Sequence, residues 1–482
     1  MLPQWRTPSA GMWLRPPAAP LCDNARVHST SAAYFLFAFI VILAYWLVAG
    51  SRLARLAVLL AANYFFCARY GLFYLALIPA CSTLDYLAGA GMQYFQKPFA
   101  RRLFLSLSLA VNLGLLILSR HMTLFLQPSL WDWIFPLSLS FYAFQSLTYT
   151  IDIYRRDAAA ASTYLGYMAA ASFFPSIQAG PITRPAEILK QLTREFTLDP
   201  ADGSRALYLI VFGLLKKLLI ADYLAGNLVN RVFDTPNLYS GLENLAAVYA
   251  YSLELYYDFS GYTDIARGCA MLLGVKLPIN FDRPYTAVNM ADFWRRWHIT
   301  FSNWLRDYLY FSLPGKRTRV GPYINLIVTM VLGGLWHGAT WPFAIWGLLH
   351  GTALAATRRW QSWRGRRPET SRVSRALRVF CTYQFVCLTW VFFRSPTAAG
   401  AFDILKRIGS LTFSLQNVSA GVILVSLVAA AGQAIPKDWY ERAVQLFGRT
   451  PFYVQAAAMA LAVIAVQLLA GRGSAPFVYT RF

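Results

Sequence analysis

Apolar stretches of nearly membrane-spanning length recur along the whole sequence, and they limit the possible folds more than any other feature. They occupy residues 33–50, 56–67, 72–90, 103–118, 134–150, 164–182, 206–219, 245–255, 324–335, 343–356, 379–393, 420–431 and 454–470. A transmembrane helix needs about 20 mostly apolar residues, so some stretches should span fully and others be short, tilted or re-entrant. Only 14% of the residues are charged, against about a quarter in soluble proteins. The sequence therefore predicts an all-α, polytopic membrane protein with roughly ten to twelve membrane elements.

The basic residues indicate how the chain is oriented in the bilayer. A net charge of +22 would also suit a nucleic-acid-binding protein. However, the lysines and arginines cluster between the apolar stretches, which is the pattern of cytoplasmic loops. The densest cluster places eight arginines between residues 358 and 378. We therefore expect a lipid bilayer around the chain and no nucleic-acid partner.

The composition of the two ends divides the chain into three parts. Residues 1–30 are rich in proline and arginine, and we expect a disordered N-terminal extension. Residues 31–471 should form the transmembrane domain, and residues 472–482 a C-terminal aromatic tail. The six cysteines mostly fall inside apolar runs and have no CxxC spacing. They are typical of packing residues, so neither a disulfide framework nor a metal site is expected.

One apolar stretch, VTMVLGGLWHGATWPFAIWGLLHG at residues 328–351, carries a histidine in its middle. Gly333 and Gly334 precede His337 on the same helical face, so we expect open volume beside the imidazole. Pro342 lacks a backbone N–H and disfavours helix at the preceding residue, which predicts a chain break there. Irregular backbone inside a membrane is tolerated where it is buried in protein or lines a wet cavity. His337 is therefore a site candidate, and the alternative is a core histidine bonded to a neighbouring helix.

The basic clusters on either side predict the depth of His337. They lie at residues 316–319 and 358–367, and both should be cytoplasmic. The chain between them must then enter the membrane and return. Its first arm, residues 320–336, would be about 25 Å long as a helix, slightly less than the roughly 30 Å hydrocarbon core. His337 would lie deep in the membrane, where groups from both compartments can meet.

A second stretch, residues 289–313, is too polar to span and is rich in tryptophan, as expected of helices at the membrane interface. His298 lies within it, either as an interfacial histidine or with a role in binding or proton transfer. Trp294, Arg295 and Trp297 are candidates for contact with an anionic or aromatic ligand group. Aromatic anchoring at the interface is the alternative for the tryptophans.

Two further stretches place polar groups beside apolar runs. ELYYDFSGYTDIARG contains Glu254, Asp258 and Asp264, and carboxylates inside a membrane are costly unless they are paired or face water. We expect them to hydrogen-bond the arginines of residues 295–306. SFFPSIQAGPITRP contains a turn rich in proline and glycine, in which Gln178 should line a cavity.

Four motifs in order over residues 175–351 resemble the membrane-bound O-acyltransferase family. They are QAGPITRP, YYDFSGYTDIARGCAMLLGVKLPINFDRPY, DFWRRWHITFSNWLRDYLY and LGGLWHGATWPFAIWGLLHG. They most resemble its bacterial branch, the alginate O-acetyltransferase membrane subunits, and the resemblance covers most of the chain after the N-terminal extension. The sequence departs from the family pattern in that extension and at residues 313–321. The resemblance implies a helical fold in which re-entrant and interfacial helices surround a central tunnel.

The resemblance also implies residue roles. His337 matches the catalytic histidine of the family, and His298 matches a second polar position upstream. We also expect Trp336 and Trp341, on either side of His337, to contact substrate. A neutral imidazole can take the proton of an acceptor hydroxyl as its oxygen attacks a thioester carbonyl. The expected donor substrate is acetyl-CoA or another acyl thioester on the cytoplasmic side, with no bound cofactor and no metal.

The function implied is that of a multi-pass enzyme of the bacterial inner membrane. It would move an acetyl group across the membrane for O-acetylation of an extracytoplasmic polysaccharide. Its partner would be a periplasmic, acetylesterase-like (SGNH-type) transferase or another polysaccharide-modification subunit. One alternative is a D-alanyl transferase of the teichoic-acid type, supplied by a carrier protein. The other is a proton-coupled transporter, although no internal repeat of the kind many transporters have is present.

The end of the chain, APFVYTRF, is unusually aromatic for a terminus. One interpretation is an interfacial anchor. Related acyl-transfer systems end in a similar Phe-aliphatic-Tyr-x-x-Phe motif, and its tyrosine is thought to carry the acyl group outward. This resemblance makes Tyr479 a candidate acyl carrier, because a phenol is a better leaving group than an alcohol.

Overall fold

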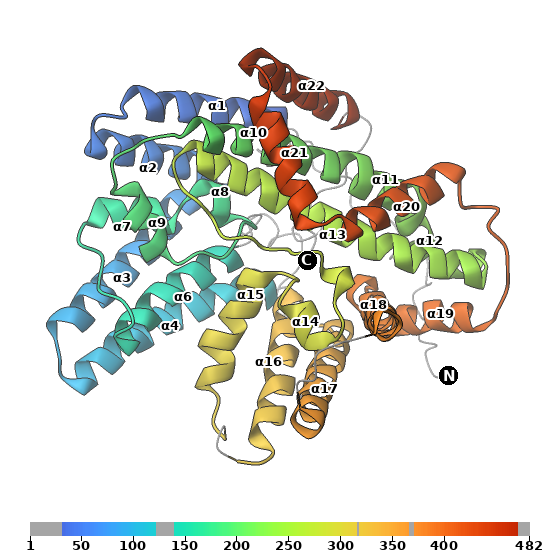
Figure 1. Cartoon of the computed structure of the whole chain (residues 1–482). Coiled ribbons are helices and arrows are strands. Elements are labelled where there is room, and N and C mark those ends of the chain that lie inside the picture. The colour runs from blue at the N-terminus through green and yellow to red at the C-terminus, as the bar shows by residue number, and fades with distance from the viewer. Residues whose placement is uncertain (1–30, 122–138, 316–317, 366–370, 471–482) are drawn as a thin grey trace, which may run out of the picture.

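The computed structural model describes residues 31–121, 139–315, 318–365 and 371–470. Within these residues the chain forms helices and no strand, so the predicted all-α class is confirmed (Figure 1). The predicted N-terminal extension and aromatic tail, including Tyr479, lie outside the described residues.

The helices from α1 to α9 form one side of the molecule, coloured blue to green in Figure 1. They are α1 (Ala32–Leu47), α2 (Arg52–Ala68), α3 (Tyr74–Tyr94), α4 (Pro98–His121), α6 (Ser140–Arg155), α7 (Tyr164–Ala171), α8 (Phe174–Ile177) and α9 (Pro185–Leu192). Buried rings such as Tyr34, Phe66 and Phe174 join α1, α2 and α8 in a shared core. This side supports the centre of the molecule from one flank.

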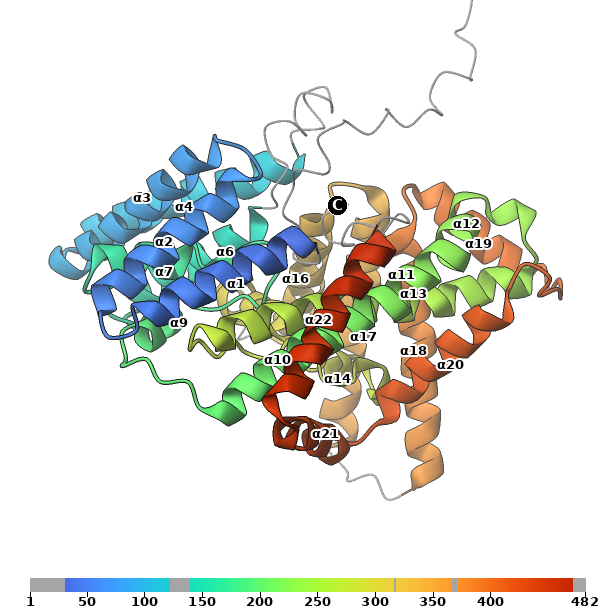
Figure 2. The same cartoon turned by 90° about the horizontal axis from the view of Figure 1, so that it is seen from above.

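Two long helical segments cross the middle of the molecule side by side (Figures 1 and 2). The first is α10 (Pro200–Leu215), which continues through wider π-helical turns and α11 (Asp222–Leu224) into α12 (Asn230–Asp234). The second is α13 (Gly241–Leu272), which begins with a capping box between Ser240 and Glu243. A Cβ added to Gly213 of α10 would lie 2.6 Å from the carbonyl oxygen of Gly261 on α13. Glycine at this crossing therefore lets the two backbones touch.

The remaining helices begin on the other flank of α13, and the last two return to α10, where the final helix also contacts α1. They are α14 (Met290–Trp294), α15 (Ile299–Trp304), α16 (Gly321–His337), α17 (Trp341–Arg364), α18 (Arg372–Arg394), α19 (Ala398–Gly409), α20 (Ala420–Ala434), α21 (Lys437–Arg449) and α22 (Phe452–Ala470). Short 3-10 or π-helical turns also occur at Pro236–Leu238, Pro284–Thr286, Leu305–Leu309 and Tyr310–Ser312. Long-range packing between α13, α18 and the 284–297 segment encloses the aromatic core of this flank.

Few of the described helices can cross a membrane unaided. By length and hydropathy three qualify, namely α3, most of α4, and α18. The pair α20 and α21, bent by 100°, would add a fourth as a broken span or a re-entrant loop. The other apolar stretches form shorter helices, such as the 16 residues of α1, or helices interrupted by charge. Of the roughly ten to twelve membrane elements predicted, most are therefore short or broken.

The helix break predicted near Pro342 is confirmed. α16 ends at His337, and α17 starts at Trp341 with Pro342 in its first turn, where a missing N–H costs nothing. The two helices pack side by side (Figure 1). A Cβ on Gly347 would lie 2.4 Å from the carbonyl oxygen of Met330. Small residues thus allow the close hairpin that places His337 at its turn.

The predicted partners of two α13 carboxylates were wrong. Asp258 contacts Lys217 Nζ at 2.5 Å, and Asp264 contacts Lys216 Nζ at 2.6 Å. Lys217 also contacts Asp222 at 2.8 Å, and its side chain is only 4% exposed. The continuation of α10 runs against α13 and supplies lysines opposite its acids, while the arginines of residues 295–306 pair with nearby Asp292 and Asp307.

Candidate active site

His337 lies at the turn of the α16–α17 hairpin inside an aromatic enclosure. Its side chain is 3% exposed. Its neighbours, with ring-centroid distances, are Trp336 (4.4 Å), Phe393 (4.8 Å), Trp346 (5.6 Å), Phe343 (5.9 Å) and Phe301 (6.3 Å). We call these five rings the His337 enclosure. They come from α15, α16, α17 and α18, so the enclosure depends on long-range packing.

The space beside Gly333 and Gly334 is filled, so the prediction that these glycines leave open volume at the imidazole was wrong. A Cβ on Gly334 would lie 2.3 Å from the carbonyl oxygen of Phe343, and a Cβ on Gly333 would lie 3.1 Å from Leu305. The missing side chains are therefore replaced by α17 and by a leucine after α15. The glycines bring helices together rather than leaving space at His337.

His298 is the second buried histidine of the region and has a left-handed backbone, with φ of 40°. It is 1% exposed, and its Nδ1 lies 3.1 Å from Oδ1 of Asn280. The same oxygen accepts hydrogen bonds from the backbone N–H and the hydroxyl of Thr300, at 3.2 and 3.0 Å. Because a backbone N–H can only donate, this atom of Asn280 must be the carbonyl oxygen. His298 must then carry its proton on Nδ1, which leaves Nε2 as the basic nitrogen of the neutral ring.

The structure brings the two candidate histidines to a single ring. The centroid of Phe301 lies 5.0 Å from the His298 ring and 6.3 Å from the His337 ring. Trp336, a predicted substrate contact, packs 4.6 Å from Phe301 and 4.4 Å from His337. These four rings therefore form one continuous group at the α15–α16 contact.

Trp294 belongs to a neighbouring structural group centred on His350. Its Nε1 donates to Nδ1 of His350 at 3.2 Å, and His350 Nε2 lies 2.9 Å from the hydroxyl of Thr389. That hydroxyl donates to the carbonyl of Val386 at 2.7 Å, so it accepts from His350. His350 is thus a neutral Nε2–H tautomer with both ring nitrogens bonded, which identifies it as a structural histidine.

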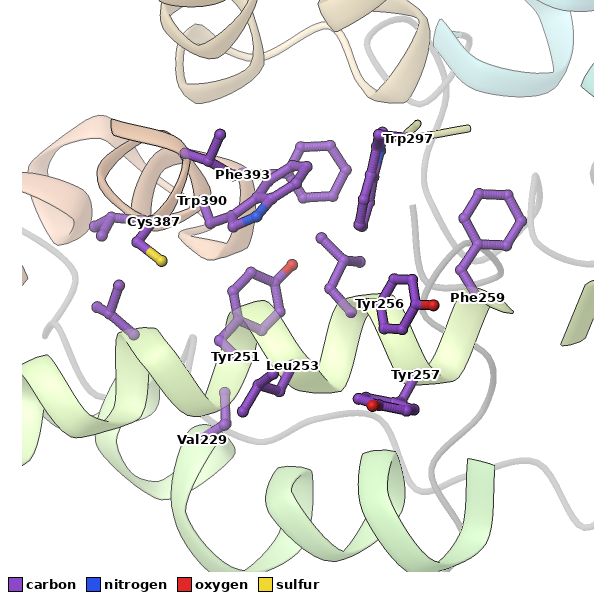
Figure 3. Close-up of a cluster of buried hydrophobic side chains, with 14 of the residues drawn as sticks. Val229, Tyr251, Leu253, Tyr256, Tyr257, Phe259, Trp297, Cys387, Trp390 and Phe393 are labelled. Carbon is purple, nitrogen blue, oxygen red and sulfur yellow. The ribbon is translucent and has the colours of Figure 1, made fainter. Parts of the chain in front are cut away.

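Trp297 is another buried member of the aromatic core. It is 1% exposed and packs 5.0 Å from Trp390 and 5.1 Å from Phe281. In Figure 3 it stands beside Trp390 and Phe393, across from the tyrosines of α13. Trp390 in turn packs 5.3 Å from Phe393 and so links Trp297 to the His337 enclosure.

The remaining predicted contacts lie elsewhere in the fold. Arg295 has a side chain 67% exposed and pairs with Asp292 at 3.2 Å. Trp341 is 79% exposed at the start of α17. Gln178 is buried and accepts a hydrogen bond of 3.4 Å from Tyr262 of α13.

Sequence reasoning missed several residues of this site. Trp346 is 1% exposed, and its indole N–H has no hydrogen-bond partner among the described residues. Asn280 lies inside a quoted motif, yet it bonds to His298, which is 18 residues farther along the chain and beyond α14. Phe301 and Phe393 look like ordinary core residues in the sequence, since only the packing of separate helices brings them to His337.

The described residues contain no group of three or more His, Cys, Asp or Glu side chains that could hold a metal ion. The side chains that the structure brings together at the site are two imidazoles, an indole N–H and an apolar enclosure. Buried imidazole beside apolar rings suits proton transfer in a water-poor setting.

The fold and the two histidines define a class of protein. Residues 65–394 match the model of the membrane-bound O-acyltransferase family. This chain belongs to that family and is an O-acyltransferase.

Individual relatives agree with this assignment. The chain is 33% identical over 413 residues to the peptidoglycan O-acetyltransferase of Helicobacter pylori, covering 77% of this chain and 78% of the relative. It is 32% identical over 495 aligned residues to the probable alginate O-acetylase AlgI of Pseudomonas putida, covering 94% and 99% of the two chains. It is also 30% identical over 237 residues to the teichoic acid D-alanyltransferase of Bacillus subtilis, covering 46% and 59%.

Proposed function

We propose that this enzyme transfers an acetyl group from a cytoplasmic thioester, across the bacterial inner membrane, to an extracytoplasmic polysaccharide. The observation that carries the proposal is the position of His337, buried at a helix break within the matched family region. The long alignments to two polysaccharide O-acetylating relatives support the substrate class. The basic loops support a cytoplasmic origin of the donor.

His337 acts as the general base in this proposal. Neutral imidazole accepts the proton of an acceptor hydroxyl while the oxygen attacks the thioester carbonyl. The tetrahedral intermediate then collapses, the carbon–sulfur bond breaks, and the thiolate takes the proton back from the imidazolium. Donor and acceptor exchange one acetyl group and one proton, so no further reactant is needed.

Trp346 is the proposed donor to the negative oxygen of that intermediate. Its buried N–H has no partner among the described residues, and its ring lies 5.6 Å from His337. An unpaired buried donor costs about 1–3 kcal/mol. A site that stabilises developing charge explains why the chain keeps such a donor there.

His298 assists from the other side of Phe301. Its backbone strain and its bond to Asn280 hold one ring orientation and one tautomer. The basic Nε2 is suited to orient or relay the proton of the acceptor. Trp336 and Trp297 then serve as apolar walls for the acyl group. The other predicted substrate contacts, which are Gln178, Trp294, Arg295 and Trp341, lie farther from the reacting atoms.

Tyr479 and a periplasmic partner complete the outward path. Acetyl transfer to the tyrosine phenol would leave an activated ester for an SGNH-type transferase or another polysaccharide-modification subunit. Tyr479→Phe keeps an aromatic anchor and removes only the hydroxyl. We expect it to abolish polysaccharide acetylation in cells, and acetylation at the normal rate would leave only the anchor role.

The D-alanyl alternative differs from the proposed function in its acyl donor. Purified enzyme in lipid vesicles should release free CoA from acetyl-CoA when an acceptor is present, and should not use a D-alanyl carrier protein. The reverse preference would replace acetyl transfer by D-alanyl transfer. The transporter alternative has lost its basis, because the chain belongs to a family of acyltransferases.

A further inference from the structure

A pocket of about 710 Å³ opens between α13, α18, α20 and the 283–286 turn. We call it the arginine pocket, and define it by Arg283, Arg296, Arg372, Arg375, Tyr285 and Gln433. Its volume falls within the 300–1,000 Å³ range that is roughly typical of cofactor and ligand sites. Neither His337 nor His298 lines it, so it is separate from the candidate active site.

The charge of the arginine pocket favours a phosphate-bearing ligand. Arg283 and Arg296 are half-buried and held by Asp282 and Asp292, at 3.4 and 3.1 Å. Arg372 and Arg375 lie exposed at the start of α18. In the part of the chain that the structure describes, no acidic side chain forms an ion pair with either of them. Guanidinium groups without a carboxylate partner bind phosphate readily through paired N–H donors.

Gln433 adds an independent sign of a ligand. It lines the same pocket and is 5% exposed. Its Oε1 is buried and has no hydrogen-bond partner among the described residues. A buried carbonyl without a donor is costly, and a ligand N–H would satisfy it. The pocket therefore offers cations at its mouth and an amide acceptor farther in.

An aromatic wall connects the arginine pocket to His337. Tyr285 of the pocket packs 6.0 Å from Trp297, and Trp297 packs 5.0 Å from Trp390. Trp390 packs 5.3 Å from Phe393 (Figure 3). Phe393 lies 4.8 Å from His337. The two rings of each pair are in direct contact. To reach the histidine from the pocket, a long, narrow ligand arm would have to displace these rings.

We propose that the arginine pocket binds the phosphate groups of the thioester donor, with Gln433 accepting an N–H of its amide-containing arm. The inference rests on the proposed function, because it identifies where that donor enters. An anionic lipid headgroup shares the phosphate chemistry. The donor is favoured because the pocket contains an unpaired amide acceptor and its Tyr285 begins the aromatic wall that joins the pocket to His337.

The test measures binding rather than turnover. Full-length protein carrying His337→Ala is placed in nanodiscs of zwitterionic lipid, and the Kd for acetyl-CoA is measured. Arg372→Gln with Arg375→Gln should raise the Kd about 100-fold, since each lost charged hydrogen bond costs about tenfold. Gln433→Leu should raise it about fivefold.

A matched control removes the same charge elsewhere. Arg358 and Arg359 are exposed on α17 and do not line the pocket, so replacing both with Gln should leave the Kd within about twofold if only the pocket matters. Equal weakening by both pairs would overturn the proposal in favour of a general charge effect.

Two further outcomes separate this proposal from the proposed function. Normal acetyl-CoA affinity in the Arg372/Arg375 variant, together with lost retention of phosphatidylglycerol in mass spectra, would identify a lipid site and leave acetyl transfer standing. Failure of the unsubstituted protein to bind acetyl-CoA would contradict both the pocket and the proposed donor.

Discussion

Two buried polar regions of this protein differ in how their polar groups are surrounded. Where the continuation of α10 runs along α13, Lys216 and Lys217 meet the carboxylates of Asp264, Asp258 and Asp222 at 2.5–2.8 Å. At the α16–α17 turn, His337 meets five aromatic rings. Charges that are matched inside a membrane protein hold helices together. An uncharged base among apolar rings is instead suited to gain and lose a proton, so the two regions should respond differently to substitution.

The largest effect should come from breaking the ion pairs. Lys217→Met leaves two buried carboxylates without their lysine and should destabilise the protein by about 3–5 kcal/mol. Unfolding in a detergent series would measure this loss, and Lys217→Arg, which keeps the charge, should recover most of it. Folded Lys217→Met protein should retain its kcat. A stable but inactive variant would mean that this region takes part in the chemistry.

The opposite pattern is expected at Trp346. Trp346→Phe keeps an aromatic ring, removes the unpaired N–H and leaves a smaller side chain. Relief of the unpaired donor should offset part of the lost packing, so the free energy of unfolding should fall less than in Lys217→Met. The kcat should fall about 10²-fold, as when one oxyanion donor is lost. Single-turnover acetyl transfer in nanodiscs measures this change in the rate of the chemical step directly.

Trp390 provides a matched control for that experiment. It is also fully buried, and its N–H likewise has no hydrogen-bond partner among the described residues. Its closest described link to His337 runs through Phe393 and Trp346. Trp390→Phe should therefore leave kcat within about twofold, and any effect of its place in the aromatic wall should appear in the donor KM. Equal losses in both variants would show that ring packing, not the Trp346 N–H, matters.

A smaller effect is expected at Asn280. Asn280→Leu removes the oxygen that holds the His298 tautomer, and we expect kcat to fall about tenfold with the donor KM unchanged. Thr300→Val removes another hydrogen bond to that oxygen but leaves the His298 bond in place. It should reduce kcat less than Asn280→Leu does. A larger loss of kcat in Thr300→Val than in Asn280→Leu would mean that the 280–300 segment contributes only to stability.

The sequence predicts features that depend on local chemistry better than features that depend on long-range packing. The break at Pro342 and the helical class follow from local chemistry and apolar patterning, and both were confirmed. The partners of Asp258 and the role of Gly334 depend on which helix lies opposite, so local reasoning assigned them wrongly. His337 stood out because a titratable ring in an apolar stretch is rare.

Other parts of the site carry no local signal. Trp346 follows His337 across a helix break, and nothing in the sequence indicates that its N–H is left without a partner. Trp341 is closer in sequence, yet its side chain is 79% exposed. Phe301 joins the two histidines only because α15 packs against α16. Residues of this kind become visible only with the tertiary structure.

The central claim is that His337 is the base for acyl transfer, and His337→Gln tests it most directly. Glutamine keeps a polar side chain in the enclosure but cannot accept the proton at neutral pH. In vesicles with acetyl-CoA on one side and acceptor on the other, we expect turnover to fall about 10²–10⁴-fold. The affinity for acetyl-CoA and the unfolding transition should stay the same. Turnover near that of the unsubstituted enzyme would contradict the account and make His337 a structural residue.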